Sequence, residues 1–351
     1  WDPHLACVAG ALAQRATSMR VTTHVINIPR LRRSPRAPID WASTVSQIAG
    51  LARDIGAQCL YANTVRAAIY TAPAARLAHH PLVWHMRDFW LSEGRPRHEW
   101  IDTALKRLLC ASASHVIVNS HAVARELPRC ERLTVVHNGV EIARFDQNVN
   151  TEDFRAQYGI AAGTPLVGMI GRLRPWKGQD RFLRIAARVK AGYPDAHFVI
   201  VGGTPFGGAD DYVAELYRLT AELGLVDKVT FTEHLQDVRP ALAAFDIFVH
   251  PGDPEPFGLV NIEAMAMQTP VVAFAHGALP EIVQDGITGI LVAPIDEKAL
   301  ADAIIALLSD PEQRRDYGEA ARRRVESHFG IAQTARKIDR ILSHVLTLQR
   351  H

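Results

Sequence analysis

Residues 167–178, VGMIGRLRPWKG, decide the fold that we predict for the chain around them. Val167–Gly171 has the continuous apolar character of a buried strand that ends in glycine, and Gly178 opens a helical pattern. Glycine lets the backbone come close to a ligand, and a helix start favours an anion. Arg172 and Lys177 between the glycines can grip different oxygens of a diphosphate. The alternative is a solvated basic loop, because the stretch matches neither the P-loop nor the full dinucleotide fingerprint.

A second informative segment is residues 252–263, GDPEPFGLVNIE. Glu255 falls in its proline-rich start, and Glu263 falls inside a predicted helix. The eight positions between them would span about 12 Å even if all were helical, whereas the two carboxylates of a glycosidase lie about 5 to 9.5 Å apart. The spacing therefore favours two contacts along one extended ligand. Ordinary glutamates on a helix surface and near a helix start are the alternative.

Short apolar runs alternate with amphipathic stretches along the whole chain, which is typical of parallel α/β sheets. We therefore predict two Rossmann-like, doubly wound α/β domains. The predicted strands are Val21–Ile28, Cys59–Tyr61, Leu82–His85, His115–Val118, Leu133–Val136, Leu166–Ile170, His197–Val201, Val229–Phe231, Ile247–His250, Val271–Phe274 and Ile290–Val292. The predicted helices are Thr44–Ile55, Arg66–Ala78, Glu99–Ala111, Ala122–Leu127, Gln179–Ala191, Asp211–Leu223, Val238–Ala244, Leu259–Met267 and Glu297–Leu308, followed by a helical segment Pro311–Leu348.

The polar, weakly patterned stretch Glu141–Gly163 predicts a domain boundary. We expect an N-terminal domain over residues 1–145, a C-terminal domain over 146–330, and a final helix over 331–351 that returns to the first domain. The chain opens directly on a helical pattern. Since a doubly wound domain normally begins with a strand and a glycine-rich loop, we expect both to be missing.

Composition limits the classes of function. With 351 residues, 48% of them hydrophobic, the chain can build two cores. A net charge of +2 does not point to nucleic acid. The four cysteines form no C-x-x-C pair and indicate reduced thiols in a cytoplasmic protein. No apolar run reaches the roughly 18 to 20 residues of a membrane span.

A larger set of motifs resembles the retaining glycosyltransferases of the glycogen-synthase-like superfamily, specifically glycosyltransferase family 4. The resemblance covers the second domain and, more loosely, the first; each motif is weak alone, but their order and spacing are specific. The motifs are Gly171-Arg172-Leu173 with Lys177-Gly178, Val201-Gly202-Gly203, Val229-Thr230-Phe231, His250-Pro251, Glu255–Leu259, Glu263–Ala266, Pro270–Ala273, Leu279–Val283, Asp285–Val292, Val118–Ser120 and Val136–Val140.

The resemblance implies a GT-B fold, two Rossmann-like domains that face a central cleft, and a nucleoside-diphosphate sugar as donor. Arg172 and Lys177 would neutralise the leaving diphosphate. Glu255 would hydrogen-bond hydroxyls of the donor sugar, and Glu263 would hold the ribose. The donor site would be completed by Gly171, Gly202 and the backbone of Phe257, Gly258 and Leu259.

Similar enzymes retain the anomeric configuration by front-face attack and need neither a metal nor a cofactor. Asp253-Pro254-Glu255 matches the D-x-D metal motif of the other glycosyltransferase fold, which is the alternative. We expect metal-independent chemistry, because the cations of the loop suffice for the diphosphate.

In the first domain, His85 ends a predicted strand, where open α/β sheets bind ligands. Similar enzymes carry a histidine here near the donor sugar, so we place His85 in the cleft; a histidine that merely ends a strand is the alternative. Further acceptor or cleft candidates are Asn63, Arg87, Asn119 and Asn138.

The segment Arg87–Leu109 mixes aromatic and basic residues, as segments on anionic membrane surfaces do. It predicts peripheral contact with the inner face of a membrane and a lipid-linked or polyanionic acceptor; an amphipathic helix packed on its own sheet is the alternative. The expected activity is sugar transfer to a glycan, a lipid-linked acceptor or a small molecule. Two alternatives stay open: a non-catalytic sugar-nucleotide-binding scaffold, suggested by the missing start, and a sugar-nucleotide epimerase.

Overall fold

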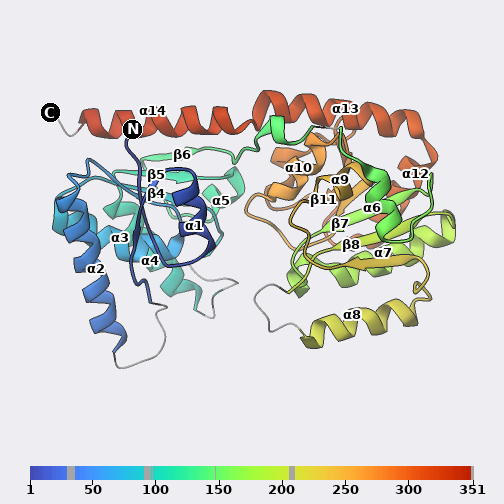
Figure 1. Cartoon of the computed structure of the whole chain (residues 1–351), viewed down its shortest axis with the longest axis horizontal. Helices are drawn as coiled ribbons and strands as arrows, with labels where there is room; N and C mark the ends of the chain where they lie inside the picture. The colour runs from blue at the N-terminus through green and yellow to red at the C-terminus, as the bar shows by residue number, and fades with distance from the viewer. Residues whose placement is uncertain (30–35, 91–95, 97, 147, 205–209, 349–351) are drawn as a thin grey trace. The chain divides into compact units, whose positions relative to one another are not determined.

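A computed structural model describes residues 1–29, 36–90, 96, 98–146, 148–204 and 210–348 of the chain (Figure 1). The chain divides into two compact units. The first unit consists of Trp1–Asn119, Val123–Val136 and Lys337–His351. The second consists of Ser120–Ala122 and His137–Arg336. None of the described helices combines the length and apolarity that crossing a bilayer requires.

The second unit is built on a sheet of six parallel strands in the order β12-β11-β10-β7-β8-β9. The chain order reverses between β7 and β10, and in such sheets ligands bind beyond the carboxyl ends of the strands at this reversal. The strands are β7 (Leu166–Ile170), β8 (His197–Val201), β9 (Val229–Thr232), β10 (Ile247–His250), β11 (Val271–Phe274) and β12 (Gly289–Val292).

Helices cover both faces of this sheet. One face carries the larger hydrophobic core, formed by alternate strand residues with α7, α8 and α12. On the other side, α10 contacts α9 and α13, and α6 contacts α9. The bounds are η1 (Ile142–Arg144), α6 (Thr151–Gln157), η2 (Pro175–Lys177), α7 (Gln179–Gly192), α8 (Asp210–Glu222), α9 (Arg239–Ala244), α10 (Leu259–Ala266), α11 (Leu279–Ile282), α12 (Glu297–Ser309) and α13 (Pro311–His328).

The first unit contains two parallel sheets, β1-β2 and β3-β4-β5-β6. Its strands are β1 (His4–Cys7), β2 (Thr22–Val25), β3 (Leu60–Ala62), β4 (Leu82–Met86), β5 (His115–Val118) and β6 (Leu133–Val135). Its helices are α1 (Ala11–Ser18), α2 (Ala37–Asp54), α3 (Val65–Ala78) and α4 (Glu99–Ser112), and α5 (His121–Arg125) begins at residues grouped with the second unit.

The C-terminal segment forms two helices, α13 and α14 (Ile331–Leu348), interrupted by Phe329 and Gly330. Val140 pairs with this interruption: its N–H donates to the Phe329 carbonyl at 2.9 Å, and its carbonyl accepts from Ile331 at 2.9 Å. Further along α14, Val345 joins a buried cluster with Val83, Ile117 and Val136. The end of α14 therefore contributes to the core of the first unit.

The predicted fold class, two Rossmann-like α/β units with a helix returning to the first, is confirmed. Strand β1 was not predicted from the sequence; it pairs with β2 and leads through Gly10 into α1. Only Cys7 of this strand is buried, so the strand has no apolar pattern to reveal it. That a further strand and a glycine-rich loop are missing stays a prediction. The stretch assigned to a domain boundary also contains a helix, α6, which Asn150 caps by accepting from the N–H groups of Glu152 and Asp153.

Candidate functional site

Two loops of the second unit, after β7 and after β10, fit closely together at the point of strand reversal. Gly178 adopts φ 74°, and a Cβ there would lie 2.5 Å from the carbonyl oxygen of Pro251. The N–H of Asp253 donates to the carbonyl of Trp176 at 2.8 Å. Gly202, after β8, leaves room for the first loop, since a Cβ there would lie 2.0 Å from the Gly171 oxygen. The glycines are thus needed for the close approach of backbone to backbone.

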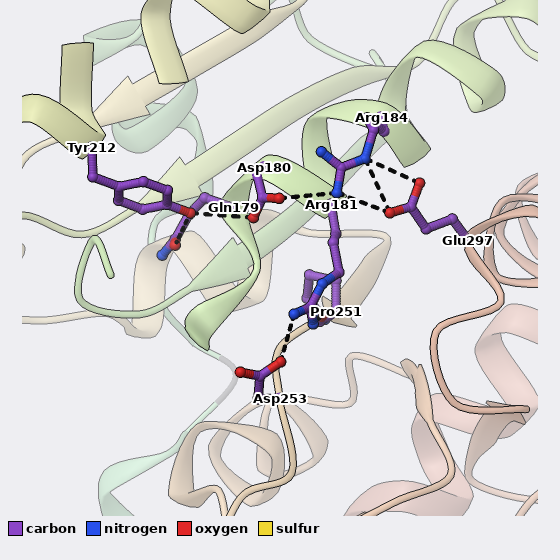
Figure 2. Close-up of polar contacts among 8 residues, drawn as sticks. All are labelled: Gln179, Asp180, Arg181, Arg184, Tyr212, Pro251, Asp253 and Glu297. Carbon is purple, nitrogen blue, oxygen red and sulfur yellow. Dashed lines mark hydrogen bonds and ion pairs between the residues drawn. The ribbon is translucent and has the colours of Figure 1, made fainter. Parts of the chain in front are cut away.

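Side chains at the start of α7 fix the same two loops (Figure 2). Arg181 donates to the Pro251 carbonyl at 2.9 Å and pairs with the Asp253 carboxylate at 2.5 Å. The buried amide of Gln179 donates to the carbonyl of Arg172 at 3.0 Å and accepts from the Tyr212 hydroxyl at 3.2 Å. These bonds set the positions of the charged groups that the loops carry.

Lys177 and Glu255, one from each loop, form an ion pair. Burial alone would raise the pKa of the Glu255 carboxyl. The opposing effect of His250, Lys177 and Arg172 is larger, so the pKa lies below its ordinary value. Burial lowers the pKa of His250 to about 4, so this imidazole is neutral at pH 7. At neutral pH the carboxylate is therefore stabilised by the two cations of the loop.

Positive charge and N–H groups remain available beside this pair. The exposed guanidinium of Arg172 has no ion-pair or hydrogen-bond partner in the described part of the chain. Helix α10 begins after Gly258, at φ 85°, and has no side-chain cap there. The first N–H groups of a helix have no partner within it, so those after Gly258 can face an anion. Phe257 is buried and anchors this helix start, whereas Leu259 is exposed.

Glu263 lies one turn further along α10, in different surroundings from Glu255. Burial raises the pKa of the Glu263 carboxyl, and the charge of Arg144 opposes this effect. No hydrogen-bond partner of its carboxylate occurs among residues 1–29, 36–90, 96, 98–146, 148–204 and 210–348. The two glutamates therefore have separate neighbours, as two contacts along one ligand require.

In the first unit, candidate residues gather at the carboxyl ends of β3, β4 and β5. The Nε of Arg87 donates to the side-chain oxygen Oδ1 of Asn63 at 2.9 Å, and its Nη2 lies 3.3 Å from Nδ1 of His85. The amide of Asn119 donates to the carbonyl of Arg87 at 3.1 Å. Burial, with the charge of Arg87 adding to it, lowers the pKa of His85 to about 3.

Asn138 occupies a turn that is bound to the C-terminal helices. The side chain of Thr334 donates to the carbonyl of His137 at 2.9 Å, and a Cβ at Gly139 would lie 2.8 Å from the backbone of Ile331. Asn138 is buried. The turn thus packs against the start of α14, which gives it a structural role.

The predicted membrane segment Arg87–Leu109 lies partly outside the described residues, at 91–95 and 97. Within the rest, Phe89 is buried, and Lys106 is buried in an ion pair with Asp102 at 2.7 Å. Neither side chain can meet a membrane surface. The exposed large apolar residues of α4 are Trp100, Ile101, Leu105 and Leu108.

One group of potential metal ligands occurs among the described residues, namely His121, His137 and Glu281. Its carboxylate already accepts the N–H groups of His121 and Ala122, both at 2.8 Å, and Nε2 of His137 at 2.9 Å. It therefore serves as a cap for the start of α5. Asp253, considered as part of a metal motif, pairs with Arg181 instead.

Family models match both halves of the chain. The model described as Glycosyltransferase Family 4 matches residues 1–144, and that of Glycosyl transferases group 1 matches residues 150–324. A D-inositol 3-phosphate glycosyltransferase of Corynebacterium aurimucosum is 31% identical over 76% of this chain and 69% of its own length. The chain belongs to glycosyltransferase family 4.

Solved structures agree with this family 4 assignment. The chain is similar to HepE of Anabaena, solved in complex with UDP, at 28% identity and a TM-score of 0.84 over 97% of this chain and 92% of HepE. HepE has also been solved with UDP-glucose. Several curated relatives are longer: the chain spans 49% of a D-inositol 3-phosphate glycosyltransferase of Nocardia farcinica, to which it is 34% identical over 61% of this chain.

Four residues of this family 4 chain that surround the predicted ones were given no role from the sequence. His250 ends β10 at the strand reversal, so the rule used for His85 could have found it. Two arginines lie far in sequence from the residues they act on: Arg144 lies near Glu263, and Arg181 joins the two loops. No local motif marks either arginine as part of a site. Tyr61 sits inside a strand and looks like a core residue, although its hydroxyl contacts His85.

Proposed function

We propose that the chain is a retaining glycosyltransferase that moves a sugar from a UDP-sugar to an acceptor. The proposal rests on one observation. Lys177, Arg172 and the uncapped start of α10 all lie near Glu255, at the strand reversal of the second unit. The UDP and UDP-glucose complexes of the similar HepE support uridine as the base. Because this chain spans about half of several relatives, their acceptors are not assigned to it.

In the proposed reaction, the bond between the anomeric carbon and the diphosphate oxygen breaks while an acceptor oxygen forms a new bond on the same face. The acceptor proton passes to the departing phosphate oxygen, so that UDP and the glycosylated acceptor result. Lys177 and Arg172 stabilise the charge that grows on the diphosphate. Glu255 holds hydroxyls of the donor sugar, and Glu263 holds the ribose.

Donor binding and donor turnover test this function in two steps. UDP and UDP-sugars should raise the melting temperature more than GDP, ADP and their sugars do, because ligands that bind only the folded state stabilise it. Incubation with the stabilising UDP-sugar should then release UDP slowly, with retention in any product formed. Binding without any UDP release would favour the non-catalytic scaffold, and a changed donor sugar with no acceptor would favour the epimerase.

Replacing Glu263 by alanine should mainly weaken donor binding. We expect the donor KM to rise about 10-fold with little change in kcat, because a hydrogen bond to the ribose is equally strong in the ground state and the transition state. Steady-state kinetics with a UDP-sugar measure this. Glu222→Ala on α8, a half-exposed glutamate paired with Arg218, is the matched control. A large loss of kcat with unchanged KM would contradict the assignment.

We also propose that the outer face of α4 contacts an anionic membrane surface near the acceptor. Trp100 is 71% exposed and Leu108 is 62% exposed, two turns apart on this helix, with Arg107 beside them. Exposed apolar residues with basic neighbours suit the interface of a bilayer. In flotation with phosphatidylglycerol vesicles, Trp100→Glu with Leu108→Glu should abolish co-flotation, whereas Val226→Glu in the second unit should not. Wild-type protein that stays with the soluble fraction would remove the proposal.

A further inference from the structure

The imidazole of His85 is held by two groups of the first unit, the hydroxyl of Tyr61 and the guanidinium of Arg87. The hydroxyl of Tyr61, on β3, lies 2.5 Å from Nδ1 of His85, on the neighbouring strand β4. The guanidinium of Arg87 lies 3.3 Å from the same nitrogen. Tyr61 also packs against the cluster to which α14 contributes Val345. Packing against this cluster thus holds the phenol ring of Tyr61 in place.

The chemistry of these partners decides which ring nitrogen carries the proton. A guanidinium has only N–H donors and no acceptor. The 3.3 Å contact with Arg87 therefore uses the single lone pair of Nδ1, which the hydroxyl proton of Tyr61 shares at the shorter distance of 2.5 Å. A neutral imidazole whose Nδ1 accepts carries its proton on Nε2. Protonation of Nδ1 would place an N–H against the cation of Arg87.

The other ring nitrogen of His85, Nε2, is buried and is left without a hydrogen-bond partner in the described part of the chain. Buried polar atoms in proteins are normally hydrogen-bonded. The burial that lowers the pKa of His85 to about 3 keeps the ring neutral throughout the physiological range.

We propose that Tyr61 and Arg87 are positioning residues that hold His85 as a neutral imidazole with its proton on Nε2, so that this N–H donates to an oxygen of the bound ligand. The assignment rests on the proposed function in one respect: the ligand oxygen is taken to be a hydroxyl of the sugar substrate. It gives His85 the role of a hydrogen-bond donor. A general base at Nε2 is excluded, because that nitrogen already carries a proton.

The tautomer can be observed directly in the free protein by nitrogen-15 NMR of histidine side chains. His85→Gln identifies the His85 signals by their loss. We expect the pattern of the Nε2–H tautomer, unchanged between pH 5 and pH 8. In Tyr61→Phe, which keeps the ring but removes the hydroxyl, a fraction of the Nδ1–H tautomer should appear. Tyr70→Phe removes another buried hydroxyl of the same unit, one bonded to the Pro29 carbonyl at 2.6 Å, and should leave the His85 signals unchanged.

Kinetics supply a second, independent readout. Tyr61→Phe should lower turnover of the UDP-sugar about 10-fold through loss of orientation. His85→Asn should lower it about 100-fold, and His85→Gln should retain more activity, because its longer side chain can place an N–H near the position of Nε2. An Nδ1–H tautomer in the wild type, titration of His85 between pH 5 and pH 8, or a Tyr61→Phe variant that matches the wild type in spectrum and turnover would overturn the inference. Absence of turnover in the wild type would contradict the proposed function alone, since NMR decides the tautomer without a donor.

Discussion

Replacement of Lys177 by alanine is expected to reduce turnover of the UDP-sugar by about 100- to 1,000-fold, the range found when one preorganised donor to a developing negative charge is removed. Lys177 reaches Glu255 across two loops that hydrogen bonds and close backbone contacts hold together. Its ammonium is therefore in place before the diphosphate begins to leave. The measurement is the rate of UDP release at saturating donor.

Two companion variants separate loss of charge from loss of structure. Lys298→Ala on α12 also removes an ammonium paired with a carboxylate, that of Asp302 at 2.6 Å, but on an exposed surface. Its turnover should equal that of the wild type. Arg172→Ala should lower turnover as Lys177→Ala does, while changing the melting temperature little, because the side chain of Arg172 has no ion-pair or hydrogen-bond partner among the described residues and acts on Glu255 only through its charge. Near-normal rates in both Lys177→Ala and Arg172→Ala would refute the roles given to the loop.

A methyl group added at Gly178 is expected to destabilise the second unit by about 3 kcal/mol or more, through positive φ and steric clash together. Gly178 has φ 74°, and the new Cβ would lie 2.5 Å from the Pro251 oxygen. This oxygen belongs to the backbone and is also bound by Arg181, so it cannot move aside without loss. Urea unfolding of Gly178→Ala measures the change.

Gly224→Ala is the matched control for this variant. Gly224 has φ 64°, close to the value at Gly178, but a Cβ there meets no atom within 4 Å. Its substitution should therefore show the conformational effect alone, about 1 kcal/mol. The excess in Gly178→Ala reports the contact between the two loops. Equal destabilisation of the two variants would mean that the loops are not in close contact, and Lys177 would then lack its support.

Periodicity and turn residues were sufficient to predict most of the fold. Strand His115–Val118 and five strands of the second unit end where their apolar runs end, and the glycines at 178 and 202 fall where backbones approach closely. Strand β1 could not be found, because three of its four residues are not buried. Helix α6 was missed because its start depends on the cap by Asn150 and not on a long apolar stripe.

The candidate site was predictable residue by residue, but its pairings were not. The eight-residue spacing between Glu255 and Glu263 separated the roles predicted for them. It gave no sign that Glu255 would meet Lys177, since that contact depends on the reversal of strand order between β7 and β10. In the same way, Tyr61 reaches His85 only because β3 and β4 are neighbours in register. Contacts of this kind between residues on different strands or loops cannot be predicted from the local sequence.

The most direct test of the account is a crystal structure of the protein with UDP bound. We expect its two phosphates to contact the Lys177 ammonium, the Arg172 guanidinium and the N–H groups that follow Gly258, with the ribose hydroxyls at Glu263. A nucleotide found at any other place, with these side chains arranged as they are without it, would contradict the central claim.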